Sequence, residues 1–183
     1  MRIGIYIGSF NPPHLGHKEV IDYLITNDYV DNLLLIPTKN YWDKQNLINI
    51  NHRINMLKYY ESDFVKVDTN HNNYAYTYEL LNALKEEYPK DELYLIIGAD
   101  NIVRFNEWKN VKEIMKHKII VIKRKDLDIN SYLEKYHFNK KQFIIINNFK
   151  PIDISSTEIR KNLTSKNLDS KVYKYIEKNN LYQ

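Results

Sequence analysis

Two histidines that could contact one ligand lie in the segment GSFNPPHLGH, residues 8–17. This segment follows IGIYI, an apolar stretch that is typical of a buried strand. Gly8 permits a close backbone approach, and Pro12 and Pro13 keep the chain extended, so we expect a turn and then an amphipathic helix that begins near Leu15. The free N–H groups at such a helix start attract anions, and phosphate is their usual ligand.

His14 and His17 lie three residues apart across the expected helix start, so both rings can face the same side of the first turn and contact one phosphate group. Gly16 leaves a position without a side chain, where a flat base or a sugar could lie against the backbone. Imidazole is also a common metal ligand, and this spacing can bind a metal, although the segment holds no third ligand. Neither GxxxxGK[ST] nor GxGxxG occurs, so kinase and dehydrogenase functions lose their main support.

A second candidate helix start lies near the other end of the chain, in DISSTEIRKNL. Ser155, followed three residues later by Glu158, forms a capping-box pattern. Arg160, in the first turns of that helix, would add a forked and permanently charged donor for phosphate oxygens. Taken alone, this stretch is more typical of an ordinary capped helix with a surface arginine.

The elements that must position these residues alternate along the chain. Short apolar runs, such as NLLLIP, LYLIIG and KIIVIKR, are separated by segments with helical periodicity. The runs are continuous, which indicates strands buried on both faces, as in a parallel sheet covered by helices. We therefore predict one α/β domain over residues 1–183, with a Rossmann-like doubly wound parallel sheet, helices on both faces and C-terminal helices packed alongside. Such sheets bind ligands beyond the carboxyl ends of their strands.

The composition narrows the classes of function. Cysteine is absent, which excludes disulfides and Cys-ligated metal sites, and a cytoplasmic location is expected. No apolar run approaches the roughly 20 residues that span a bilayer, so no membrane partner is expected. The formal net charge of +4 suits anionic small ligands, although a general enrichment in Lys, Asn and Ile would explain it equally well. Nucleic acid is not an expected partner, because no zinc-finger or RNP signature occurs.

The two motifs together resemble those of one enzyme superfamily. GSFNPPHLGH resembles the G-x-F-x-P-x-H-x-G-H signature of nucleotidyltransferases with an HxGH motif, and ISSTEIR resembles their ISST-x-IR motif. This resemblance implies an enzyme that places the α-phosphate of ATP for in-line attack, with histidines that stabilise the charge on the departing pyrophosphate. It implies catalytic roles for His14, His17 and Arg160. It also implies that ATP is bound by Gly8, Ser9, Phe10, Gly16, Ser155, Ser156 and Thr157.

The middle of the chain bears on the acceptor of the transferred group. LIIGADNIVRFNEW resembles the IIG-x-D stretch with a following Trp that marks nicotinate-mononucleotide adenylyltransferases. The resemblance implies that Gly98, Asp100 and Trp108 bind the acceptor, with Asp100 accepting from ribose hydroxyls and Trp108 stacking on a pyridine ring. In the alternative interpretation, Asp100 caps the next helix and Trp108 belongs to the core.

A further stretch, NYAYTYELL, resembles the SYT-x-x-T/S-L segment at a helix start in the same family, with Ala75 in place of the usual Ser. The resemblance implies that Tyr76 and Thr77 lie at an acceptor-binding helix start, where backbone N–H groups bind a carboxylate or phosphate. Plain capping of the helix by Thr77 is the alternative.

IPTKNYWDKQ aligns with a family segment that usually contains PPHK. Lys44 keeps the basic residue and is a further predicted acceptor contact, but residues 41–43 depart from the Pro-Pro-His pattern. The long polar loop of residues 38–50 is a candidate lid, with a disordered surface loop as the alternative. HRINML and the C-terminal KVYKYIEKNNLY also resemble the family, so the resemblance extends from Arg2 to Tyr182.

The resemblance thus implies transfer of AMP from ATP to nicotinate mononucleotide, which yields nicotinate adenine dinucleotide and pyrophosphate in NAD biosynthesis. Nicotinamide mononucleotide, or use of both acceptors, is the nearest alternative, followed by phosphopantetheine. The alternative from another class is a regulatory nucleotide-binding module without catalysis, and His14, His17 and Arg160 count against it. Mg²⁺ is expected to bridge the ATP phosphates without a dedicated protein cage. A homo-oligomer is compatible with the sequence, which does not specify the oligomeric state.

Overall fold

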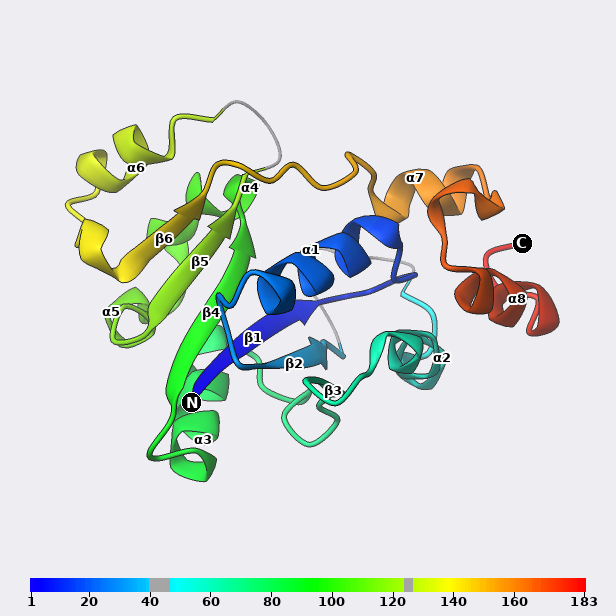
Figure 1. Ribbon diagram of the computed structural model, residues 1–183, viewed down its shortest axis with the longest axis horizontal. Helices are drawn as coiled ribbons and strands as arrows, with labels where there is room; N and C mark the ends of the chain where they lie inside the picture. Colours follow the sequence, from blue (N-terminus) through cyan, green and yellow to red (C-terminus); the bar gives the residue numbers. More distant parts are fainter. Residues whose placement is uncertain (40–46, 124–126) are drawn as a thin grey trace.

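The computed structural model describes residues 1–39, 47–123 and 127–183. In this part of the chain six strands form one sheet in the order β3-β2-β1-β4-β5-β6, and every neighbouring pair is parallel (Figure 1). The strands are β1 (Arg2–Gly8), β2 (Asn32–Pro37), β3 (Val65–Val67), β4 (Glu92–Gly98), β5 (Lys118–Ile122) and β6 (Phe143–Ile146).

Helices connect the strands. The α-helices are α1 (Leu15–Thr26), α2 (Ile50–Leu57), α3 (Thr77–Glu87), α4 (Ala99–Ile102), α5 (Val111–Ile114), α6 (Ile129–Lys135), α7 (Ser156–Lys161) and α8 (Ser170–Lys178). Single 3-10 turns are η1 (Lys58–Tyr60), η2 (Phe105–Glu107), η3 (Lys140–Gln142) and η4 (Ser165–Asn167). None of the helices in the described ranges is long and apolar enough to cross a membrane.

The strand order confirms the predicted doubly wound sheet. The chain begins in β1, moves outward through β2 to β3, returns to β4 on the other side of β1, and then moves outward again to β6. The order therefore reverses between β1 and β4, and the carboxyl ends of these strands, Gly8 and Gly98, flank the crevice in which such sheets bind ligands.

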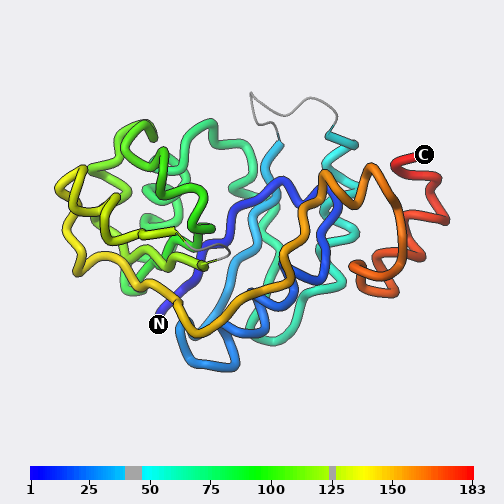
Figure 2. The backbone as a smooth tube through the Cα atoms, turned by 90° about the horizontal axis from the view of Figure 1, so that it is seen from above, coloured from blue at the N-terminus to red at the C-terminus, as the bar shows by residue number. Residues whose placement is uncertain are grey.

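Two apolar clusters, one on each face of the sheet, hold the helices in place. Ile5 of β1 packs with residues of α3, α4, α5 and α6, whereas the next residue, Tyr6, packs with residues of α1, α2, α7 and α8. This alternation follows from the two-residue period of a strand and confirms the helices on both faces. Figure 2 shows the C-terminal segment beside α2, far from α6, which confirms the C-terminal helices packed alongside the sheet.

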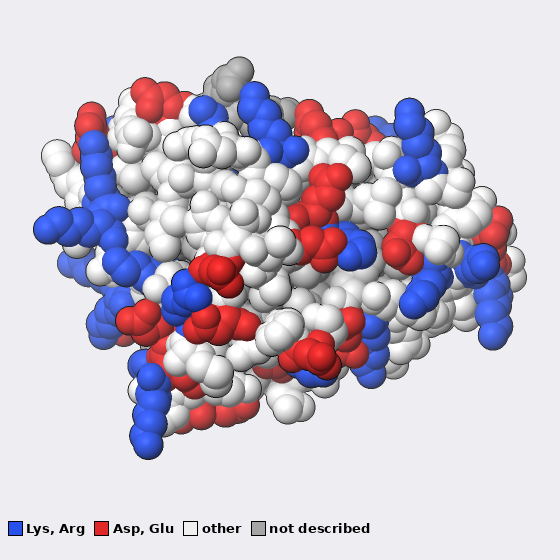
Figure 3. All heavy atoms as spheres, viewed as in Figure 1, with Lys and Arg blue, Asp and Glu red and all other residues white. Residues whose placement is uncertain are grey.

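One helix is shorter than the sequence pattern indicates, whereas the distribution of charged side chains follows the sequence. The segment after Trp108 has a helical pattern, but its helix covers only Val111–Ile114 and cannot begin earlier, because Asn110 adopts the left-handed conformation with φ of 52°. Figure 3 shows Lys and Arg side chains interspersed with Asp and Glu on the face shown, in agreement with the dispersed charge of the sequence.

Candidate active site

The first predicted helix start is formed as expected. Helix α1 begins at Leu15, and His14 is its N-cap residue with an extended backbone. The Nδ1 atom of His17 accepts a hydrogen bond from the N–H group of His14 at 3.2 Å, and the two ring centroids lie 3.7 Å apart. The prediction that both rings face one side of the first turn is therefore confirmed. Because Nδ1 of His17 is an acceptor, the ring carries its proton on Nε2, where it can be donated to a ligand.

The glycines of this loop make room for aromatic rings of the protein. A Cβ atom on Gly8 would lie 3.0 Å from the ring of Phe10, and one on Gly16 would lie 3.1 Å from Nδ1 of His14 and from the carbonyl oxygen of Ile152. A side chain at position 16 would therefore meet the His14 ring and this carbonyl, and the predicted place for a base or sugar at Gly16 stays a prediction.

Phe10 is a buried residue of the same loop, and its predicted role in ATP binding stays a prediction. Its side chain is only 1% exposed and packs edge-on against the rings of Tyr6 and His17, with centroid distances of 5.6 and 5.0 Å. The buried Phe10 ring supports the His17 imidazole from the core, so a contact of Phe10 with ATP would be made by its backbone. Its backbone has a φ of 45°, a left-handed conformation that directs the ring inward.

The second helix start carries the predicted capping box. The hydroxyl of Ser155 accepts from the N–H group of Glu158 at 3.2 Å, and the Glu158 carboxylate accepts from the N–H group of Ser155 at 2.8 Å. These two bonds fix the beginning of α7 and place the next residues, Ser156 and Thr157, in its first turn.

The structure brings the two motifs into direct contact (Figure 1). The hydroxyl of Ser156 donates to the carbonyl oxygen of Pro12 at 2.9 Å, and Nη1 of Arg160 donates to the carbonyl oxygen of Asn11 at 2.7 Å. A second guanidinium nitrogen of Arg160 donates to the hydroxyl of Thr157 at 3.3 Å. The arginine and the histidine pair thus border one region at the carboxyl end of β1.

Arg53 is a residue of this region to which the sequence pattern gave no role. Its guanidinium is 1% exposed and donates to the carbonyl oxygens of Ser9 and Thr38, both at 2.7 Å, while its Nε donates to Ile48 at 3.2 Å. Burial lowers the pKa of Arg53, yet a guanidinium remains charged at neutral pH. One buried cation therefore joins the loop after β1 to both ends of the loop of residues 38–50. In the sequence, Arg53 was marked only by its position in HRINML, a stretch that resembles the family.

The predicted acceptor residues of β4 lie on the other side of the strand-order reversal. Gly98 ends β4, and Asp100 is an exposed residue in the first turn of α4. A Cβ atom on Gly98 would lie 2.6 Å from Oδ1 of Asp100, so the glycine allows the carboxylate to fold back over the strand end. Gly98 itself is the N-cap residue, without a side-chain cap, so capping does not account for Asp100.

Trp108 and the Tyr76–Thr77 helix start lie on one side of the molecule. The Trp108 ring is partly buried against Phe105, at a centroid distance of 5.2 Å, so it borders the core without being enclosed by it. Nζ of the adjacent Lys109 lies 6.0 Å from the ring centroid of Tyr76. Tyr76, and not Thr77, is the N-cap residue of α3, so the alternative of capping by Thr77 is wrong.

The predicted lid and the alternative of a metal site remain to be compared with the structure. Lys44 and most of the candidate lid lie outside the described residues, at 40–46. Within the described ranges, no group of three His, Cys, Asp or Glu side chains could hold a metal ion, so a His14–His17 metal site gains no support.

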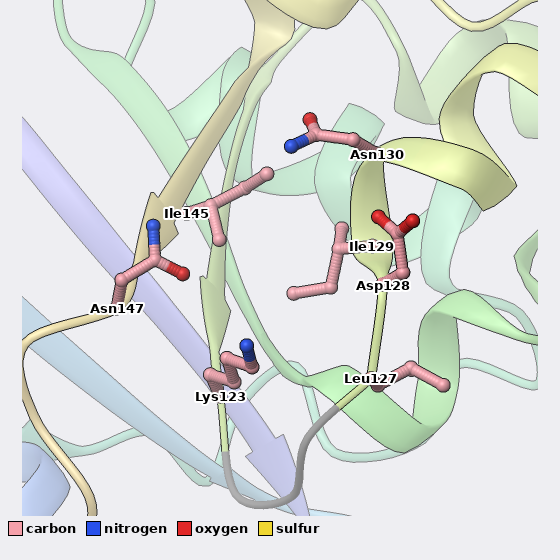
Figure 4. A pocket seen from close by; sticks show the side chains of 7 residues that line it. All are labelled: Lys123, Leu127, Asp128, Ile129, Asn130, Ile145 and Asn147. Atoms are coloured by element: carbon pink, nitrogen blue, oxygen red, sulfur yellow. The ribbon is translucent and has the colours of Figure 1, made fainter.

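A cavity of about 360 Å³ lies at the carboxyl ends of β5 and β6, beside α6 (Figure 4). Its lining combines apolar side chains with amide, carboxylate and ammonium groups. It is lined by Lys123, Leu127, Asp128, Ile129, Asn130, Ile145 and Asn147. None of these is a predicted site residue, and the cavity lies two strands away from the His14–His17 pair along the sheet.

Comparison with known proteins identifies the family. The cytidylyltransferase-like family pattern matches residues 5–162. A relative from Fusobacterium nucleatum, named a probable nicotinate-nucleotide adenylyltransferase, is 36% identical over 97% of this chain and 98% of its own length. The nicotinate-nucleotide adenylyltransferase of Bacillus subtilis is 28% identical over 100% of this chain and 98% of its own. The structure of Plasmodium falciparum nicotinic acid mononucleotide adenylyltransferase complexed with NaAD matches with a TM-score of 0.83 at 28% identity, and covers 99% of this chain and 97% of that chain. This chain belongs to the cytidylyltransferase-like family, among relatives named as nicotinate-nucleotide adenylyltransferases.

Proposed function

We propose that this chain transfers AMP from ATP to nicotinate mononucleotide, forming nicotinate adenine dinucleotide and pyrophosphate in NAD biosynthesis. The observation that carries the proposal is the contact between the two phosphate motifs, made by Ser156 with Pro12 and by Arg160 with Asn11. Full-length similarity to nicotinate-nucleotide adenylyltransferases supports the choice of reaction. We further propose that the whole chain works as one nucleotidyltransferase domain in the cytoplasm.

The chemistry follows from the charges of the site. A phosphate oxygen of the mononucleotide attacks the α-phosphorus of ATP, the bond from that phosphorus to the bridging oxygen breaks, and pyrophosphate leaves with the electron pair. His17 donates from Nε2 to the phosphates, where negative charge develops, and His14 lies against it. Arg160 holds the β- and γ-phosphates with its forked donors, and the Ser155–Thr157 helix start adds N–H groups. These groups position the phosphates of ATP and stabilise the negative charge that develops on them. No covalent bond to the protein is needed.

Mg²⁺ would be held mainly by the substrate. The described residues offer no cage for a metal ion, whereas triphosphate oxygens are the ligands that Mg²⁺ prefers, with water in the remaining positions. A bound Mg²⁺ would neutralise charge on the phosphates. The protein's own contribution remains the imidazole, guanidinium and N–H donors.

The acceptor is assigned to the crevice beside β4. Asp100 would accept from the ribose hydroxyls, because its exposed carboxylate lies at the strand end. Trp108 would stack on the pyridine ring, and the backbone at Tyr76 and Thr77 would bind the nicotinate carboxylate or the phosphate. Lys44 stays a predicted contact of the same substrate.

Pyrophosphate release from ATP, measured with each mononucleotide in turn, tests the function. We expect release with nicotinate mononucleotide and a much lower kcat/KM with nicotinamide mononucleotide, because the amide lacks the carboxylate charge. Comparable rates would identify a dual-specificity enzyme. Release with phosphopantetheine alone would overturn the choice of acceptor, and no release with any acceptor would leave only a nucleotide-binding module.

Replacing Trp108 with alanine is expected to raise the KM for nicotinate mononucleotide about fivefold, since stacking of aromatic rings contributes about 1 kcal/mol beyond their burial. The kcat and the KM for ATP should change little, and Trp108→Phe should restore most of the affinity. Steady-state kinetics with each substrate varied will measure this. A lowered unfolding temperature with an unchanged acceptor KM would instead show that Trp108 serves only to cover Phe105.

A further inference from the structure

The last residues of the chain turn back towards the loop after β1. After α8 the N–H group of Leu181 donates to the carbonyl oxygen of Ile176 at 3.1 Å, and the Leu181 side chain is buried in the core. Asn180 and Tyr182 both adopt the left-handed conformation, with φ of 50° and 64°. This turn directs the Tyr182 side chain at the GSFNPPHLGH segment, where its hydroxyl donates to Oδ1 of Asn11 at 2.9 Å.

Asn11 is the point at which three distant segments meet. Its side chain is 1% exposed, and Oδ1 accepts both from Tyr182 and from the N–H group of Ile48 at 3.4 Å. Its carbonyl oxygen accepts from Nη1 of Arg160 at 2.7 Å. The residue that orients Arg160 is therefore itself oriented by the end of the chain.

The charges around Tyr182 favour a donating hydroxyl. Burial raises the pKa of the Tyr182 hydroxyl well above its ordinary value, and the nearby charges of Arg160 and Arg53 oppose this without reversing it. The phenol therefore stays protonated across the physiological pH range. The bond to Asn11, whose carbonyl oxygen accepts from Arg160, places the hydroxyl beside the predicted phosphate site.

We propose that Tyr182 is a positioning residue for the triphosphate of ATP, which acts through Asn11 on Arg160. The proposal rests on the proposed function. Without the hydroxyl, Asn11 loses the bond of 2.9 Å at Oδ1, which is shorter than the bond from Ile48, and the peptide that holds Arg160 gains freedom to rotate. A displacement of about 1 Å at a positioning group can lower turnover about a hundredfold, so a partial loosening has a measurable effect.

Tyr182→Phe tests the proposal because it removes one oxygen atom and keeps the ring. Loss of one hydrogen bond to a positioning residue should weaken ATP binding, and lower kcat/KM for ATP, about tenfold. The KM for nicotinate mononucleotide should not change. Calorimetric titration with ATP in the absence of acceptor, together with steady-state kinetics, measures both effects.

Tyr175→Phe is the matched control. The Tyr175 hydroxyl also lies in the C-terminal segment and bonds Nδ1 of His52 at 2.9 Å and Nδ2 of Asn55 at 3.0 Å, so its removal costs more hydrogen bonds. We expect it to lower the unfolding temperature at least as much as Tyr182→Phe while leaving ATP binding unchanged. Equal ATP binding in the two variants would overturn the proposal.

A double-mutant cycle tests whether Tyr182 affects ATP binding through Asn11. If Tyr182 acts through Asn11, adding Tyr182→Phe to Asn11→Ala should weaken ATP binding no further, whereas independent effects would add. Additive effects would therefore contradict the proposed path. A wild-type protein that binds ATP but releases no pyrophosphate with any acceptor would refute the proposed function, and the ATP titrations would still decide the role of Tyr182.

Discussion

Replacing His17 with alanine should lower kcat about a hundredfold to a thousandfold, the range found when one donor to a developing negative charge is removed. The His17 ring lies 3.7 Å from that of His14 and carries its proton on Nε2, on the opposite side of the ring from the bond to the His14 N–H group. Alanine removes this donor. The fold should persist, because the bond that the ring accepts at the helix start is worth only about 1 kcal/mol.

The expected loss is measured as pyrophosphate release under saturating substrates, with circular dichroism to follow the fold. His137→Asn is the control, because His137 is exposed in the turn after α6 and tolerates a residue suited to its φ of 55°. This variant should keep wild-type kcat. A kcat within about threefold of wild type for His17→Ala would remove the histidine pair from the proposed chemistry, since a phosphate donor is worth far more than that.

Replacing Arg53 with methionine should produce the largest change in stability, a loss of about 3–5 kcal/mol in the free energy of unfolding. Methionine fills much of the volume but donates nothing, so the carbonyl oxygens of Ser9, Thr38 and Ile48 lose the guanidinium that they share. Arg53→Lys should recover only part of this loss, because one ammonium group cannot reach all of these acceptors in the geometry of the guanidinium fork.

Urea unfolding measures the effect, with Arg104→Met as the control. The Arg104 side chain is 77% exposed and pairs with Glu107 at 2.9 Å, and exposed ion pairs of this kind contribute about 0–1 kcal/mol. If Arg53→Met unfolded at the same urea concentration as Arg104→Met, the buried guanidinium would not be holding the loop. Any activity that survives in Arg53→Met should show a raised KM for ATP, because the Ser9 end of the phosphate loop is released.

The local pattern of the chain was sufficient to predict much of this architecture. The continuous apolar runs predicted a parallel sheet, and the change from strand to helical periodicity placed the start of α1 at Leu15. The Ser155–Glu158 spacing predicted a capping box that is present. These features depend on residues within a few positions of one another, so their physical causes are contained in short stretches of sequence.

Other parts of the site could not be predicted in this way. The ring of Phe10, a residue of the first motif, packs against His17 in the core, and Gly16 lies against the His14 ring and the carbonyl oxygen of Ile152. Arg53 bonds carbonyl groups, which every residue possesses, so no particular partner residue marks the contact in the sequence. The role of each of these residues depends on which backbone segments the fold brings near it.

The sequence by itself determined the chemical groups available, the order of strands and helices along the chain, and the resemblance to nucleotidyltransferases that the relatives confirm. Only the tertiary structure decided that Arg160 is bonded to Asn11 and that Tyr182, 171 positions away along the chain, holds the other side of that asparagine. The reason is that the parallel β–α packing brings the C-terminal segment to the carboxyl end of β1, beside the loop that holds Asn11. Hydrogen bonds between segments so far apart leave no periodic trace in the sequence.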